Sequence, residues 1–224
     1  MNIQSLLINA VAVIVGIVIH ESAHALAAYL LGDKTARSRG RMSINPMNHI
    51  DPFGTIILPL LMLAAGGPVF AFAKPVPVYL NNLKHPKRDE LLVALAGPAS
   101  NVLLAVLAAL INWAIFAFGM QYLGISLANG ILNFTITFMV VNLSLAFFNL
   151  IPLPPLDGSS ILVPFLKGEA LRQYYRIQQY SMPILIVVLY LLPRLINVDL
   201  VGYYFDFTVY PLAQALLDFI LTAI

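Results

Sequence analysis

Residues 5–31 read SLLINAVAVIVGIVIHESAHALAAYLL, an apolar run long enough to cross a bilayer that contains the pattern HExxH at residues 20–24. Residues four apart share one face of a helix, so His20 and His24 can turn their imidazoles toward one metal ion while Glu21 stands beside them. An ionisable side chain at mid-membrane costs roughly 2.5 kcal/mol or more on insertion scales. Three such side chains together therefore indicate a zinc-type site with a carboxylate base, rather than a chance string or a buried polar patch.

The composition is that of an integral membrane protein with several crossings. The 224 residues are 60% hydrophobic and 10% charged. The first apolar run has no basic n-region and is too long for a signal peptide, so we expect it to be retained. The chain has no cysteine, so a metal must be held by His, Asp, Glu or backbone oxygen. The formal net charge of +2, with basic residues in loops beside apolar spans, gives no reason to expect nucleic acid as a partner.

The pattern predicts an all-α polytopic membrane protein with about five to six transmembrane helices. Gly32 is expected to end the first helix, because glycine is favoured just past a helix C-terminus. Residues 37–51 are rich in Gly, Ser, Asn and Pro and predict turns or short β-strands at the membrane surface. Small residues in AGPASN, residues 96–101, predict close packing of another helix. The predicted helices cover about 5–31, 89–118, 127–151, 180–192 and 200–223.

Residues 53–72 are apolar and just long enough to span, but prolines and glycines interrupt them. If this segment crossed once, the loops 32–52 and 73–89, each with four Lys or Arg, would lie on opposite sides of the membrane. One of them would then violate the positive-inside rule. We therefore expect a re-entrant segment that enters and returns on the cytoplasmic side, with its irregular backbone lining a cavity.

Residues 74–79, KPVPVY, alternate like a strand but carry two prolines, which are tolerated on an edge strand and not in a central one. The segment is either an extended linker or an exposed edge to which an unwound substrate adds through main-chain hydrogen bonds. In the second interpretation the substrate-binding residues are Pro75, Val76, Pro77 and Val78.

Residues 149–158, NLIPLPPLDG, break the helix predicted at 127–151, because three prolines in four positions prevent a regular helix. HExxH supplies two ligands, and a catalytic zinc site usually has three protein ligands plus water. The candidates for the third ligand are Asp157, His49, His85 and Glu169. Asp157 is the best placed, because it belongs to a broken membrane helix and the others lie in ordinary basic loops.

Together, HESAH, AGPASN and NLIPLPPLDG resemble the motifs of the site-2 protease family of intramembrane metalloproteases, over roughly residues 10–165. The resemblance implies that His20, His24 and Asp157 bind one zinc ion per chain and that Glu21 is the general base. It further implies that Asn149 orients the scissile peptide or stabilises the oxyanion. The chain has no PDZ-like insertion between the motifs, and its third motif reads DGS where many members have DGG.

The expected protein is thus a zinc metalloendopeptidase that cuts within or near transmembrane segments of membrane-protein substrates, as in regulated intramembrane proteolysis. We expect it in a prokaryotic cell membrane, with the active site toward the cytoplasmic side and surrounded by lipid. We expect a single protease domain over 1–224, with a catalytic core at about 5–165 and C-terminal helices at about 179–224. At 1.5 Å of rise per residue, the metal lies roughly 12 to 18 Å below the surface near Gly32, so a polar channel must bring water to it.

Rival functions come from other classes. A membrane zincin acting on lipidated or soluble protein ends would take its third ligand from a Glu on a following helix, and no such Glu presents itself. A zinc-binding transporter would be expected to have repeated halves, and a non-proteolytic scaffold would normally have lost Glu21. The sequence does not identify the natural substrate, the regulator or the oligomeric state.

Overall fold

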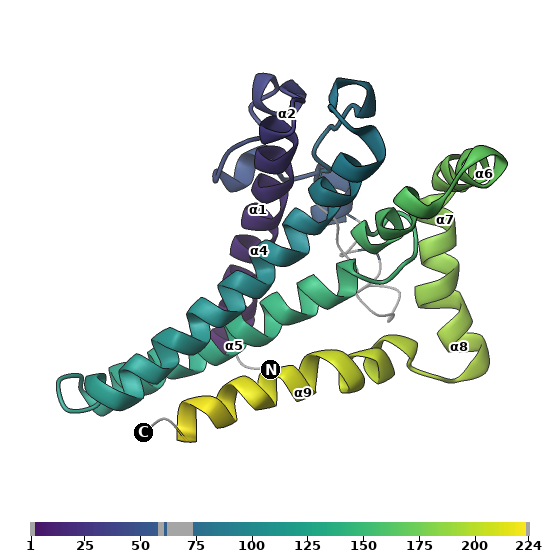
Figure 1. Cartoon of the computed structure of the whole chain (residues 1–224). Helices are drawn as coiled ribbons and strands as arrows, with labels where there is room; N and C mark the ends of the chain where they lie inside the picture. Colours follow the sequence, from purple (N-terminus) through teal and green to yellow (C-terminus); the bar gives the residue numbers. More distant parts are fainter. Residues whose placement is uncertain (1–2, 58–60, 62–73, 223–224) are drawn as a thin grey trace. The chain divides into compact units, whose positions relative to one another are not determined.

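The computed structural model describes residues 3–57, 61 and 74–222, and these residues form helices joined by turns, with no strand among them (Figure 1). The described residues divide into two compact units. Residues 3–16, 98–149 and 199–222 form the first, and the described parts of 17–97 and 150–198 form the second. The four long helices are α1 (Ile3–Leu30), α4 (Pro86–Ala114), α5 (Ile125–Asn149) and α9 (Leu200–Thr222). The shorter helices are α2 (Thr35–Ser38), η1 (Pro46–Asn48), η2 (Pro52–Ile57), η3 (Leu80–Asn82), η4 (Ile115–Gly119), η5 (Asp157–Phe165), α6 (Gly168–Gln178), α7 (Ser181–Ile186), η6 (Val187–Leu191) and α8 (Leu192–Ile196).

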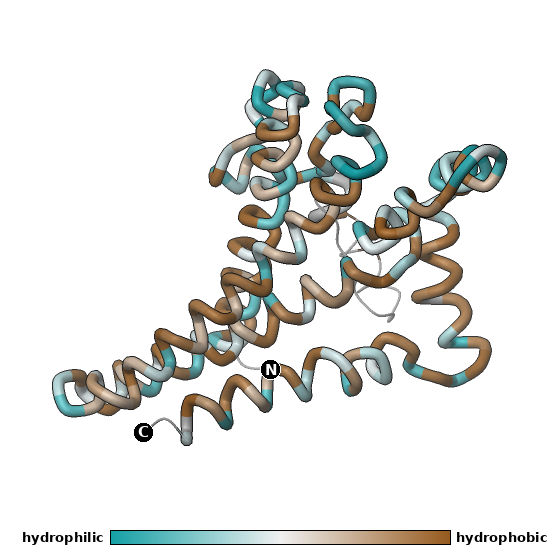
Figure 2. Tube along the Cα trace, in the orientation of Figure 1, coloured by the Kyte–Doolittle hydropathy of each residue, from teal (hydrophilic) through white to brown (hydrophobic). Residues whose placement is uncertain are grey.

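Three of the described helices are long and apolar enough to cross a membrane: α1, α4 continued by η4, and α5. Figure 2 shows the apolar residues along these helices. A fourth candidate arises only if α6 and the helices at 181–196, bent by 75°, count as one span. The five to six spans predicted from the sequence are therefore not confirmed. The difference lies in the C-terminal part, where the polar residues of α9, including Asp206 and Asp218, lower the hydropathy of that helix.

The expected short β-strands are also absent from the described residues. Residues 37 and 38 end α2, residues 39–51 form turns and η1, as the Gly and Pro content indicated, and residues 74–79 have irregular backbone. Pro75 and Pro77 have no N–H to donate to a ladder, and the amides of Lys74, Val76 and Tyr79 donate to other parts of the chain. The predicted re-entrant segment at 53–72 falls mostly outside the described residues; of it, 53–57 belong to η2.

In the first unit, α4, α5 and α9 pack through small and aliphatic side chains. Alanines of α4 meet Met139 and Leu143 of α5 and Val209 of α9. The buried amide of Asn101 donates to the Asn142 side chain at 2.9 Å and to the Gly16 carbonyl at 3.1 Å, which links α4 to α5 and α1. Small residues and shared polar groups are the usual means of joining helices in lipid.

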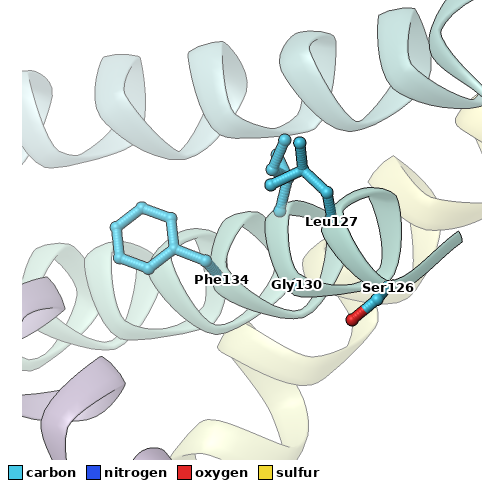
Figure 3. A pocket seen from close by; sticks show the side chains of 5 residues that line it. Ser126, Leu127, Gly130 and Phe134 are labelled. Atoms are coloured by element: carbon cyan, nitrogen blue, oxygen red, sulfur yellow. The ribbon is translucent and has the colours of Figure 1, made fainter. Parts of the chain in front are cut away.

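The first unit also has an open groove of about 550 Å³ on the N-terminal half of α5 (Figure 3). Its wall consists of apolar side chains, one serine and the bare backbone of Gly130. No ionisable or metal-ligating side chain is among these lining residues. The lining residues are Ser126, Leu127, Gly130, Ile131 and Phe134.

In the second unit, α1 ends as predicted at Gly32. The amide of Gly32 donates to the Tyr29 carbonyl at 3.2 Å, and the amide of Asp33 donates to the Ala28 carbonyl at 2.9 Å. The φ of Gly32 is +119°, a value that L side chains rarely adopt. This paired arrangement is a Schellman motif, and it places Asp33 directly after the helix that carries HExxH.

Candidate metal centre

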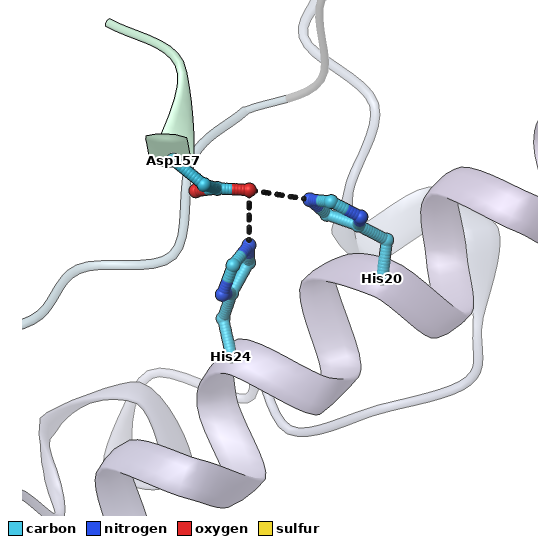
Figure 4. A group of neighbouring side chains, drawn as sticks. All are labelled: His20, His24 and Asp157. Atoms are coloured by element: carbon cyan, nitrogen blue, oxygen red, sulfur yellow. Dashed lines mark hydrogen bonds and ion pairs between the residues drawn. The ribbon is translucent and has the colours of Figure 1, made fainter. Parts of the chain in front are cut away.

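His20 and His24 of α1 meet Asp157, the first residue of η5 (Figure 4). The Oδ2 atom of Asp157 lies 3.1 Å from His20 Nε2 and 3.3 Å from His24 Nε2. Both histidines are buried, at 6% and 8% exposure. The three donor atoms lie within 4.8 Å of one another, and no other such group of three occurs among the residues that the structure describes.

The donor set fits zinc. Two atoms bound about 2.1 Å from a tetrahedral zinc ion lie about 3.4 Å apart, close to both imidazole-to-carboxylate distances. Two imidazoles and one carboxylate also leave a fourth position for water or substrate, as catalytic zinc sites do. In these respects the residues match a hydrolytic centre rather than a closed structural one.

A carbonyl of α4 orients one ligand. His24 Nδ1 lies 2.7 Å from the Val93 carbonyl, which can only accept, so Nδ1 carries the proton and Nε2 keeps its lone pair for a metal. Such a second contact fixes the ring and raises the basicity of the ligating nitrogen.

Gly97 of α4 makes room for both rings. A Cβ atom at this position would lie 2.4 Å from His24 Nε2 and 2.5 Å from His20 Nε2. The sequence indicated only close helix packing at AGPASN. In the structure, the groups that lie against the Gly97 backbone are the imidazoles of the two candidate ligands, so the missing side chain makes room for them.

After the proline-rich break, the chain folds back so that the residue following Asp157 packs against the backbone of Leu150. A Cβ atom on Gly158 would lie 2.2 Å from the Leu150 carbonyl oxygen, so only glycine fits after Asp157. Further along η5, Ser160 lies 3.5 Å from Glu90 of α4, and Glu90 also accepts from the Tyr175 hydroxyl at 2.7 Å. The Ser160 contact joins the segment that carries Asp157 to α4, and the Tyr175 hydrogen bond joins α6 to α4. Sequence reasoning missed Glu90 and Tyr175, because no local pattern singles out either residue.

Glu21, the expected base, accepts a hydrogen bond from the Val76 amide at 3.2 Å. The predicted substrate-binding segment, Pro75 to Val78, therefore lies beside the HExxH helix. It reaches this place as irregular backbone and not as a strand.

The other candidates for the third ligand do not join the cluster. His49 is buried, and its Nε2 donates to the Ser43 carbonyl at 2.6 Å. His85 lies 4.0 Å from Asp89, and Glu169 pairs with Arg172 at 3.2 Å. Each of these three side chains instead contacts a residue close to it in the sequence.

Asn149, expected to act on the substrate, is the last residue of α5 in the first unit. Its side-chain amide donates to the Leu145 carbonyl one turn earlier, at 2.9 Å. Its role toward a substrate stays a prediction.

HExxH lies on a helix that is long and apolar enough to cross a membrane, and an aspartate far along the chain completes the group of three donors. These features define a class, the membrane proteins with a metallopeptidase-type centre. The model of Peptidase family M50 matches residues 8–121 and 114–192, and the chain belongs to this family, the site-2 proteases. The family is one of zinc metalloproteases, and so zinc is the metal that the cluster suits.

Named relatives agree with this assignment. The chain is 38% identical to "Putative zinc metalloprotease YwhC" of Bacillus subtilis (strain 168), over 82% of this chain and 80% of the relative. It is 33% identical to "Putative zinc metalloprotease Rip2" of Mycolicibacterium smegmatis, over 85% of this chain and 70% of the relative. No solved structure matches the chain.

Proposed function

We propose that the chain is an intramembrane zinc endopeptidase that hydrolyses peptide bonds within or near transmembrane segments of other membrane proteins, as in regulated intramembrane proteolysis. One observation carries the proposal: the HExxH histidines of an apolar, membrane-length helix lie within 3.3 Å of an aspartate 137 and 133 residues away. A metal centre within the membrane-spanning part of such a helix is poorly accessible to soluble substrates. It is well placed for substrates that lie in the same bilayer.

The roles of the residues follow from their chemistry. His20, His24 and Asp157 would hold one zinc ion, which activates water and polarises the scissile carbonyl. Glu21 takes a proton from the attacking water as the new C–O bond forms. It then gives that proton to the leaving amine as the C–N bond breaks. Asn149 is proposed to orient the peptide or stabilise its oxyanion, as the family resemblance implies.

The segment from Pro75 to Val78 is proposed to hold an unwound substrate. A residue that precedes proline is pushed toward extended backbone, and this applies to Lys74 and Val76. In extended backbone, successive residues point to opposite edges, and the amides of Lys74 and Val76 are already engaged. The opposite edge then offers the carbonyls of Pro75 and Pro77 and no donor. A substrate would therefore have to donate its own backbone N–H groups to these carbonyls. Unwinding of a substrate helix releases such groups from their internal hydrogen bonds.

The protein is proposed to lie in a prokaryotic cell membrane with its active site toward the cytoplasm. Four basic residues follow α1 within eleven positions, at the end of the helix that carries the ligands. Four more occur at 74–88. Basic loops of this kind favour the cytoplasmic side.

The test uses purified protein in liposomes with a pool of synthetic single-span peptides, and mass spectrometry identifies new peptide ends. Wild type is compared with Glu21→Gln, which removes the base but none of the three ligands. We expect both proteins to retain zinc and only the wild type to cleave. Equal cleavage by both would contradict the role of Glu21. Retained zinc without cleavage of any peptide by the wild type would favour a transporter or scaffold.

A further inference from the structure

Asp33 is a completely buried carboxylate, with 0% exposure, at the end of the helix that carries HExxH. Its Oδ1 accepts from the Thr35 amide at 3.0 Å, from the Thr35 hydroxyl at 2.6 Å and from the Asn82 side chain at 2.9 Å. Its Oδ2 accepts from the Tyr79 amide at 2.7 Å. Asp33 thus ties the end of α1 to a part of the chain 46 to 49 residues away.

The Asp33 side chain is ionised at neutral pH. Burial acts to raise its pKa, but the hydrogen bonds from Thr35, Tyr79 and Asn82 outweigh burial and hold the pKa below its ordinary value. Hydrogen bonds to an ionised acceptor are roughly twice as strong as neutral ones. The link between Asp33 and Tyr79 is therefore a strong anchor.

The anchored segment is short and stiff. Proline fixes φ at positions 75 and 77, and both residues that precede these prolines are restricted as well. Tyr79 follows Val76 by three positions, which gives a reach of at most about 10 Å. Fixing Tyr79 at Asp33 therefore limits where the Val76 amide can lie, and in the structure that amide donates to Glu21 Oε2 at 3.2 Å.

We propose that Asp33 is a positioning residue of the metal centre: it holds residues 74–79 in the register that lets the Val76 amide orient the Glu21 carboxylate. The Val76 N–H fixes one carboxylate oxygen, and the other stays free to take the proton of water. This inference rests on the proposed role of Glu21 as the base. The hydrogen bonds of Asp33 go to Thr35, Tyr79 and Asn82, and not to the candidate metal ligands.

The test is a double-mutant cycle with the single-span peptide that the wild type cleaves fastest. Asp33→Asn puts an NH₂ group where the carboxylate accepts. Val76→Pro deletes the donor, and Val76→Ala is its reference, because it keeps the N–H. We expect Asp33→Asn to lower kcat about tenfold, and Val76→Pro to lower it about tenfold relative to Val76→Ala. The double variant Asp33→Asn/Val76→Pro should be no slower than Val76→Pro alone, because both changes break one link.

The matched control is Asp89→Asn, which alters another buried carboxylate that accepts a backbone amide. That hydrogen bond comes from His85, at 2.8 Å, and not from residues 74–79. In the double variant Asp89→Asn/Val76→Pro, the fold-losses in kcat of the two single variants should multiply, as expected for independent sites. If Asp33→Asn multiplies in the same way, or leaves kcat within twofold of wild type, the positioning role is wrong. If Asp33→Asn does not fold, Asn82→Ala takes its place, with an expected two- to threefold loss that disappears in the Val76→Pro background.

A second readout needs no cleavage. Hydrogen exchange at the Val76 amide should become about tenfold faster in Asp33→Asn, with zinc content unchanged, and should stay at the wild-type rate in Asp89→Asn. An unchanged Val76 amide in Asp33→Asn would overturn the inference. Because this readout is independent of any substrate, it separates failure of the positioning role from failure of the proteolytic function.

Discussion

Gly97→Ala should remove zinc while leaving the helices intact. The new Cβ atom would lie 2.4 and 2.5 Å from the two Nε2 atoms, about 1 Å closer than ordinary van der Waals contact allows. Each ring would have to move by about that distance, whereas a metal site tolerates shifts of only about 0.2 Å. Neither ring can move freely, because His24 is tied to the Val93 carbonyl and both rings are buried. We expect zinc affinity to fall by about 100-fold or more.

Helix propensity acts in the opposite direction, since alanine favours a helix over glycine by about 1 kcal/mol. A loss of zinc therefore cannot be attributed to a weaker α4. The matched control is Gly130→Ala, another helical glycine, whose Cβ would meet nothing within 4 Å. Zinc per protein is measured by elemental analysis, and affinity by competition with a chelator. Wild-type affinity in Gly97→Ala would refute the packing argument and the site geometry with it.

Two further predictions concern the ligand set and the topology. Asp157→Ala should weaken zinc binding more than about 100-fold while His49→Ala leaves it unchanged, as measured by the same chelator competition; the reverse result would make His49 the third ligand. Lys84→Cys places one cysteine at an exposed position of a chain that has none, so a membrane-impermeant thiol reagent should label it only from the cytoplasmic side. Labelling from outside would overturn the proposed orientation.

Local sequence patterns predicted those parts of the protein whose physics is local. HExxH on an apolar run implies ligands on one helical face, glycine after that run implies the helix end at Gly32, and three prolines imply the break before Asp157. Each of these follows from backbone sterics or helix geometry within a few residues. The number of spans was predicted less well. The chain bends at 178–181, and polar residues lower the hydropathy of α9, so neither segment qualifies by itself as a membrane span.

The tertiary structure alone decided how distant residues meet. The sequence favoured Asp157 among four candidate third ligands, and only the fold shows its carboxylate beside His20, 137 residues away. The space that Gly97 leaves for the imidazoles depends on how α4 lies against α1, and the Asp33 anchor depends on where residues 74–79 run. The physical reason is the same in each case. Burial and hydrogen bonding between segments far apart in the chain depend on the packed fold, whereas local patterns report only what the nearest few residues favour.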